Sequence, residues 1–433
     1  MDNIVCVLGN EFEYDFLSAW IKYNRIEAGI SQEALSHGIC SISLLSCFEN
    51  GRKKLRGELI EALLKKLKIT AIVGAKDIGL IRQKFHKLMF HIESFEYEAA
   101  ETTFTELLTL EPLLRISPYN IEFNIYKLMY KIMVERKNYN ELESTIGIFD
   151  KIYNSLEKEL QYIYLLITGK FLYDNLNHSE GVNRLEKAYC LKETPWINYR
   201  LGVAYCLNYE HLKSIVYLEK ALSSYSMTGR YRNSLECHSF LGSSYTFLKM
   251  YSKAEFHLNS VINGSDYFTL NKNTFGVYTN LANLYFKMGR YEESISYCQL
   301  AMNPPKSTEA DNQWLKAAWH SSEEPMLAAC IYVEVHKKLN NALKCKEIFD
   351  KYLNSAYENS VYYHYLNSLY LSIFHFNDDM FYDEITNTIL PFYKNIGYLS
   401  IYNKLQLMLI KHLESKRRYK EANSIYRSLV EFE

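Results

Sequence analysis

The clearest pattern of apolar and polar positions is a repeat of 40 residues in the middle of the chain. The segments LGVAY, LGSSY and LANLY begin at Leu201, Leu241 and Leu281, and each has a tyrosine four positions after its leucine. Residues four apart lie on the same face of an α-helix, so each segment predicts one buried helical face. A fixed period of this size predicts stacked pairs of helices rather than one closed core.

The second helix of each predicted pair begins with a tyrosine that is followed three positions later by a small or apolar residue. These positions are Tyr97 with Ala100, Tyr139 with Leu142, Tyr209 with Leu212, Tyr251 with Ala254, Tyr291 with Ser294, and Tyr419 with Ala422. His178 and Gly181 stand in the same two places near the middle of the chain. We expect about nine helix pairs between residues 78 and 433. The stretch 305–325 departs from the pattern.

Residues 281–304 resemble the tetratricopeptide repeat. The matching positions are Leu281, Ala282, Tyr285, Gly289, Tyr291, Ser294, Ala301 and Pro304. Small residues at 282 and 294 would let the two helices of the pair approach closely. Gly289 can adopt the left-handed backbone conformation of the turn between them, and Pro304 would end the second helix.

Residues 1–69 follow a different pattern, with short helices separated by tight turns. We predict that a first helix ends at Gly29 and that Ser31 caps the second helix. The third helix is predicted over residues 41–50. A connector at residues 70–78 would join this domain to a repeat domain at residues 79–433.

The third helix divides into an apolar face and a face of small polar residues. Leu45 and Phe48 are three apart and would face the core with Leu35 from the second helix. A short helix that presents small residues can enter the major groove of DNA. Four cations follow within five residues and would suit contacts to phosphate. The residues that this pattern turns outward are Ile42, Ser43, Ser46 and Cys47, and the cations are Arg52, Lys53, Lys54 and Arg56.

This segment resembles the helix-turn-helix of Cro/repressor-like (XRE) regulators, which have the lambda-repressor type of fold. The resemblance rests on Arg25, on the turn Gly29-Ile30-Ser31-Gln32, and on Phe48-Glu49-Asn50-Gly51. It implies an internal ion pair between Arg25 and Glu49. It also implies that a set of DNA-binding residues approaches the duplex, namely Gln32, Ser41, Ile42, Ser43, Ser46 and Cys47. Cys47 departs from the family, in which many relatives have Arg or Lys. The alternative is a helical cap domain that does not bind DNA.

Composition and charge narrow the class of protein. The 433 residues include 49 Lys+Arg and 50 Asp+Glu, and the formal net charge is −1. This balance argues against non-specific coating of nucleic acid, which needs a large positive excess. Only 17 glycines and 7 prolines occur, and apolar residues make up 48%. We therefore expect an all-α protein with a substantial core.

The remaining sequence signals favour a cytoplasmic protein that is not an enzyme. The nine cysteines form no CxxC pair, which is consistent with reduced thiols. The chain begins without a signal-peptide pattern, and no run of 18 apolar residues suggests a membrane span. HExxH, GxSxG, P-loop and GxGxxG motifs are absent from the sequence. We expect no metal and no cofactor.

A helix-turn-helix domain joined to tetratricopeptide repeats resembles the RRNPP family of peptide-responsive regulators, and within it the RstA-type branch. The resemblance implies an all-α protein with a right-handed repeat superhelix. It also implies a quorum-sensing transcriptional regulator that binds promoter DNA as a homodimer. A short signalling peptide would bind in the groove of the repeat domain. Members of the family commonly control sporulation, competence or virulence genes.

Candidate peptide-binding residues lie on the first helix of each pair, at positions that would point into the groove. They are Asn283, Asn280, Thr279, Lys287, Ser243, Ser239, Glu236, Tyr199, Arg200 and His238. Asn283 leads the group because its amide both donates to and accepts from an extended peptide backbone. The alternative is that these are ordinary solvated residues of the groove.

Two rival functions remain open at the level of sequence. One is a Rap-like adaptor that inhibits a signalling protein by direct contact. The N-terminal helices of that class lack a basic recognition helix, so the basic cluster that begins at Arg52 argues against it. The other is a chaperone-type scaffold that clamps a C-terminal carboxylate. That scaffold would need a groove rich in Lys and Arg, and most of the candidate positions are neutral.

Overall fold

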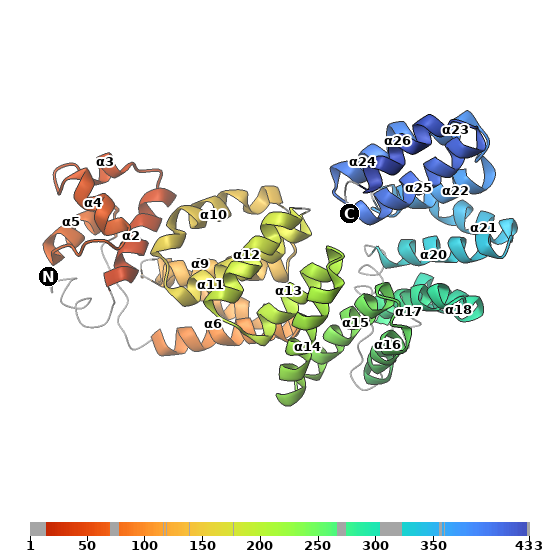
Figure 1. Cartoon of the computed structure of the whole chain (residues 1–433). Helices are drawn as coiled ribbons and strands as arrows, with labels where there is room; N and C mark the ends of the chain where they lie inside the picture. Colours follow the sequence, from red (N-terminus) through yellow and green to blue (C-terminus); the bar gives the residue numbers. More distant parts are fainter. Residues whose placement is uncertain are drawn as a thin grey trace. The chain divides into compact units, whose positions relative to one another are not determined.

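The structure is a computed structural model that describes residues 14–69, 78–115, 117, 119–137, 139–175, 177–265, 274–303, 323–354, 357–358 and 360–430. The secondary structure of these residues is entirely helical (Figure 1). The chain divides into two compact units, Met1–Ser234 and Leu235–Glu433. The expected all-α fold class is confirmed for the described residues.

The first unit begins with four short helices that we call the head, residues 14–69. They are α2 (Tyr14–Glu27), α3 (Gln32–Ser36), α4 (Ile42–Glu49) and α5 (Gly57–Lys66). The side chains of Trp20, Leu35, Leu45 and Phe48 are all buried, so the predicted apolar face of the third helix packs as expected. Gly29 has a φ of 67°, and the Ile30 N–H donates to the Arg25 carbonyl oxygen at 3.0 Å, which ends α2 at the predicted place.

Paired helices make up the rest of the first unit. They are α6 (Ile78–Glu93), α7 (Tyr97–Thr109), α8 (Glu111–Arg115), α9 (Asn120–Met133), α10 (Tyr139–Ile152), the 3-10 turn η2 (Tyr153–Ser155), α11 (Lys158–Asp174), α12 (His178–Leu191), α13 (Pro195–Leu207) and α14 (His211–Met227). Most of the predicted connector, residues 70–77, lies outside the described residues, and α6 begins at its last residue.

The second unit continues the same arrangement, and α15 (Tyr231–Phe247) crosses its boundary. Its other helices are α16 (Tyr251–Ser265), α17 (Thr274–Met288), α18 (Tyr291–Met302), α20 (Glu324–Lys338), α21 (Ala342–Tyr352), α22 (Tyr363–Phe374), α23 (Asp379–Glu384), the π-helical turn η4 (Ile385–Ile389), α24 (Leu390–Asn395), α25 (Leu399–Ser415) and α26 (Tyr419–Val430). Pro304 and most of the stretch 305–325 lie outside the described residues.

The turns between paired helices repeat with the sequence period. Tyr209, Lys249 and Gly289 have φ values of 63°, 60° and 76°, respectively, and they stand 40 residues apart. After each of them, the next backbone N–H donates to the carbonyl oxygen of the repeat tyrosine five positions earlier, for example from Arg290 to Tyr285 at 2.9 Å. A left-handed residue with this bond is the usual helix stop. The second helix of each pair begins two residues after the left-handed residue.

This turn corrects one predicted register. Tyr97, Tyr139, Tyr251, Tyr291 and Tyr419 each begin a helix, as predicted, and His178 begins α12. Tyr209 instead occupies the turn, and α14 begins two residues later at His211. Its small buried residue is therefore Ser214 rather than Leu212, whose side chain is 71% exposed. The local motif was ambiguous because two aromatic residues lie two positions apart.

The small residues of the repeat permit close packing within each pair. A Cβ atom at Gly202 would lie 2.5 Å from Leu218 Cγ, and one at Gly242 would lie 2.5 Å from Leu258 Cγ. The equivalent positions one repeat later are Ala282 and Cys298, where a larger residue faces a smaller one. The total side-chain volume is thus kept roughly constant, as a close-packed interior requires.

Most of the repeat tyrosines serve in packing. Tyr205 stacks on Tyr217 with ring centroids 5.6 Å apart, and Tyr285 stacks on Tyr297 at 5.5 Å. Tyr245 and His257 form the equivalent stack at 5.4 Å. The high tyrosine content of the repeats is therefore explained by the contacts between paired helices. No described helix is both long and apolar enough to cross a membrane.

Candidate functional site

The helix α4 of the head carries its small residues on the solvent side. Ser41 caps the helix, and its Oγ accepts a hydrogen bond from the Leu44 N–H at 3.2 Å. The side chains of Ser41, Ile42 and Ser43 are exposed, and those of Ser46 and Cys47 are half-buried. An exposed isoleucine at the start of a short helix leaves an apolar contact surface that the head itself does not use.

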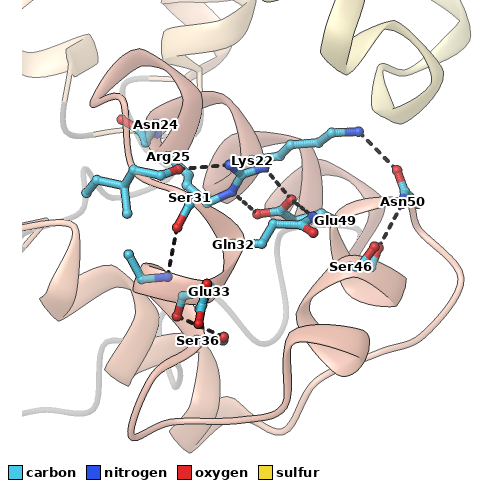
Figure 2. A network of polar contacts seen from close by, with 12 residues as sticks. Lys22, Asn24, Arg25, Ser31, Gln32, Glu33, Ser36, Ser46, Glu49 and Asn50 are labelled. Carbon is cyan, nitrogen blue, oxygen red and sulfur yellow. Dashed lines mark hydrogen bonds and ion pairs between the residues drawn. The ribbon is translucent and has the colours of Figure 1, made fainter.

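An internal ion pair fixes the position of α4 (Figure 2). Arg25 on α2 donates from Nε to Glu49 Oε1 at 2.6 Å and from Nη2 to Oε2 at 2.8 Å. The Glu49 side chain is fully buried. The bidentate contact with the Arg25 guanidinium compensates its charge. The pair that the family resemblance implied is therefore present, with a positional role.

Gln32 has an internal partner that the sequence did not indicate. Its Nε2 donates to Glu49 Oε2 at 2.7 Å, which completes the set of donors around this carboxylate (Figure 2). The amide of Gln32 thus orients Glu49 in this structure. Its predicted contact with DNA stays a prediction.

The four predicted phosphate contacts lie on the loop between α4 and α5. The side chains of Arg52, Lys53, Lys54 and Arg56 are all exposed. Leu55, between them, is buried with 3% exposure and anchors the loop to the core. The Arg52 N–H donates to the Cys47 carbonyl oxygen at 2.9 Å. These contacts hold a concentrated positive charge beside the outward face of α4.

The head also contacts the repeat helices of its own unit. Ser155, in the turn η2, donates from Oγ to the Glu49 carbonyl oxygen at 2.8 Å. Lys22 Nζ donates both to Asn50 Oδ1 at 3.0 Å and to Ser155 Oγ at 3.3 Å. The Tyr23 and Phe149 rings lie 5.6 Å apart. The C-terminal end of α4 is therefore attached to the end of α10, a contact that no local sequence signal predicted.

The predicted peptide-binding residues of the first unit are Tyr199 and Arg200, both on α13. Tyr199 is 4% exposed and packs edge-on against Phe95 with ring centroids 6.1 Å apart. Its predicted place on an open groove is therefore wrong for this conformation, because the α6–α7 turn covers it. Arg200 is half-buried, and its guanidinium lies over the rings of Tyr199 and Trp196 at 5.3 and 5.9 Å.

Two predicted residues of the second unit have internal roles. Thr279 is 1% exposed, so its predicted place on an open groove is wrong for this conformation. It lies three positions before Ala282, the small residue of α17. His238 Nδ1 lies 2.8 Å from His257 Nδ1, and burial lowers the pKa of both imidazoles, that of His257 to about 4. Burial therefore favours the neutral form of both rings.

The other predicted peptide-binding residues of the second unit keep side-chain surface. Glu236, Ser239, Ser243, Asn280 and Asn283 are half-buried, and Lys287 is exposed. Surrounding protein lowers the pKa of Lys287, and Lys404 and Lys249 lower it further, whereas Glu334 opposes them. These residues come from the first helices of successive pairs. Their role in ligand binding stays a prediction. Within the described part of the chain, no group of three or more His, Cys, Asp or Glu side chains could hold a metal ion.

The paired helices have the fold of the solved Rap and NprR structures. Residues 275–303 match the tetratricopeptide repeat family. The expected resemblance to the RRNPP proteins is thereby confirmed for the fold. No curated protein matches the chain in sequence.

Particular solved structures share this fold over most of their length. A Rap protein complexed with competence and sporulation factor has a TM-score of 0.64 at 14% identity, over 82% of this chain and 97% of that one. The apo quorum sensor NprR from B. thuringiensis has a TM-score of 0.61 at 18% identity, over 81% and 98%. NprR in complex with its cognate peptide NprX also has a TM-score of 0.61, at 16% identity, over 81% and 98%.

Proposed function

We propose that this protein is a DNA-binding regulator whose repeat region binds a short signalling peptide. The observation that carries the DNA-binding part is the outward face of α4, with Ser41, Ile42 and Ser43 exposed beside the exposed cations of the next loop. The likeness in fold to NprR with its cognate peptide supports the peptide-binding part. The head would be a helix-turn-helix in which α3 and α4 are the two helices.

The chemistry of the two surfaces is complementary to duplex DNA. Small side chains at the start of α4 allow its backbone to approach base edges in the major groove. Arg52, Lys53, Lys54 and Arg56 would contact phosphates on either side. The ion pair of Arg25 with Glu49 holds α4 in place, so the helix does not have to be ordered at the moment of binding.

A dimer would let two heads read one site. A single short helix reads few base pairs, and two heads about 34 Å apart would reach successive major grooves on one face of the duplex. A peptide that binds one arrangement of the repeats better than another would shift the population of DNA-competent dimers. The contact of Ser155 with Glu49 supplies a physical link through which the repeats could set the head position.

The DNA-binding part is tested by gel shift of the full-length protein on the DNA upstream of its own gene. The double variant Arg52→Ala with Lys53→Ala removes two predicted phosphate contacts. We expect its affinity to fall several-fold at about 150 mM salt, and the slope of log K against log salt to become shallower by about 2.

The matched control removes the same charge outside the head. Lys338→Ala with Lys346→Ala replaces two exposed lysines of the second unit, and this control should bind DNA like the wild type. Equal loss in both double variants would mean that net charge rather than the head is responsible. Undiminished binding by the head variant would contradict the proposed interface.

A second candidate function is a repeat adaptor that binds a signalling protein directly. The likeness in fold to a Rap protein favours it. An adaptor would show no gel shift with or without peptide, and it would retain one protein partner from lysate whether or not Arg52 and Lys53 are replaced. A regulator of the kind that we propose would lose its DNA complex in that variant.

A further inference from the structure

The side chain of Arg200 on α13 is a half-buried cation that lacks an acidic partner among the described residues. Its contacts are the faces of Trp196 and Tyr199 and a long contact from Nη2 to Met133 Sδ at 3.9 Å. The buried Nε has no hydrogen-bond partner in the part of the chain that the structure describes. An arginine in a structural ion pair looks different, as Arg25 shows with its two bonds to Glu49.

The surroundings of Arg200 add positive charge rather than compensate it. Lys170, on the neighbouring α11, is half-buried, and among the described residues its carboxylate partner is Asp174, one turn further along the same helix. Burial lowers the pKa of Lys170, Asp174 opposes that effect, and Arg200 and Arg136 lower the pKa further. Arg200 and Arg136 thus add positive charge beside Lys170.

A second donor lies on the same face of α13. Trp196 and Arg200 are four positions apart, so their side chains lie side by side, and the buried indole Nε1 of Trp196 also has no hydrogen-bond partner among the described residues. Buried donors without acceptors are costly and are uncommon in native proteins. A cluster of donors and cations with few acceptors is complementary to a group that only accepts hydrogen bonds and carries negative charge.

We propose that Arg200, together with Lys170 and Arg136, forms an anion site that holds a carboxylate of the regulatory peptide. The guanidinium offers two parallel N–H groups to both carboxylate oxygens, which a lysine could not do. The flat rings of Trp196 and Tyr199 keep the guanidinium in one plane and limit its contact with water. The inference rests on the proposed peptide-binding function and adds the chemical class of the ligand, an acidic peptide.

The carboxylate could belong to an Asp or Glu side chain or to the C-terminus of the peptide. Two pairs of probes distinguish these sources. The first pair is acetyl-Ala-Ala-Asp-Ala-Ala-amide and the same peptide with Asn in place of Asp. The second pair is acetyl-pentaalanine as the free acid and as the amide. Binding of each probe is measured by calorimetric titration of the full-length protein.

We expect the acid of at least one pair to bind about tenfold more tightly than its amide. This preference should disappear in Arg200→Met. It should persist in the control Lys192→Met, which removes an exposed cation that lies over the ring of Tyr162 and is paired with Glu159. Equal binding of acid and amide, no measurable binding of either acid at millimolar concentration, or a preference that survives in Arg200→Met would overturn the proposal.

Thermal unfolding without ligand separates a binding role from a structural one. Removal of a partly buried cation that lacks a counter-charge should leave the Tm of Arg200→Met unchanged or raise it. Arg25→Met should lower the Tm by several degrees, because it leaves Glu49 buried and unpaired. A similar drop in both variants would assign Arg200 to the core. An intact gel shift alongside a failed peptide preference would refute this site and leave the DNA-binding proposal standing.

Discussion

At the scale of single residues, volume and charge compensation decide what each position tolerates. Gly202 and Gly242 face leucines, whereas Ala282 faces a cysteine. The same contact between paired helices is therefore packed with two different pairs of side chains within one chain. Ser214 and Ser294 each donate to the carbonyl oxygen of the small residue opposite, at 2.8 and 2.7 Å. The helices of a pair are therefore held by both fit and hydrogen bonds.

Replacement of the Gly242/Leu258 pair by the Ala/Cys pair of the next repeat tests this compensation of side-chain volume. Gly242→Ala should destabilise the protein by about 1–2 kcal/mol, because the added Cβ would overlap Leu258 Cγ and overpack this contact. Leu258→Cys alone should cost about 2–3 kcal/mol through the cavity that it leaves. The double variant should be more stable than the sum predicts by about 1 kcal/mol, as measured by urea unfolding. Strict additivity would show that the two positions do not share one space.

Glu122 on α9 gives a prediction for the pH dependence of stability. Burial raises its pKa to about 6. Arg82, whose Nε lies 3.4 Å from Glu122 Oε2, opposes this rise. Since the folded pKa lies above the unfolded value, the folded state holds the proton more tightly. The stability contributed by this group is therefore fully present below about pH 4.5 and is lost as the pH rises to about 6.

Glu122→Gln should remove this penalty. The variant should be more stable than the wild type by about 1–2 kcal/mol at pH 7, and the difference should vanish near pH 4. Urea unfolding of both proteins at a series of pH values measures the difference directly, because the other titrating groups are shared. A wild type that is the more stable protein at pH 7 would mean that the pairing with Arg82 outweighs burial.

At the scale of elements, the end of α4 is where the head and the repeats meet. Its last residue uses the carboxylate to bind Arg25 and the carbonyl oxygen to bind Ser155. One residue thus joins the internal geometry of the head to the turn after α10. A shift of that turn would be transmitted directly to the helix that we propose to read DNA.

Ser155→Ala tests this connection. Loss of one hydrogen bond worth about 1 kcal/mol should speed amide hydrogen exchange in α4 about fivefold, because local opening becomes easier. Ser179→Ala, at an exposed serine of α12, provides the control. Unchanged exchange in α4 would show that the head holds its position without the contact.

At the scale of the whole molecule, the proposed reading of DNA requires two chains. The mass of one chain is 51.0 kDa. We expect light scattering during gel filtration to give twice that mass, alone or with DNA, because one short helix reads too few base pairs for specific binding. A complex with DNA that contains one chain would contradict the proposed arrangement.

Much of the architecture was predictable because it depends on residues close together in the sequence. The period of 40 residues, the left-handed turn at Gly289, the cap at Ser31 and the apolar face of α4 each follow from local rules of helix formation. The fold class was accordingly predicted, as were most of the starts named for the second helices of the pairs. Tyr209 shows the limit of such rules, since two overlapping motifs competed and only the packed structure selected one.

The sequence by itself therefore determined the class of fold and the cationic loop beside α4, whereas the division into a head and repeats stays a prediction. Only the tertiary structure decided that Tyr199 and Thr279 are buried, that Gln32 supports Glu49, and that Arg200 has no acidic partner among the described residues. The physical reason is that these properties depend on side chains far away in the sequence. A periodic pattern fixes which face of a helix is apolar, but a residue at the edge of that face is covered or exposed according to the helix packed against it.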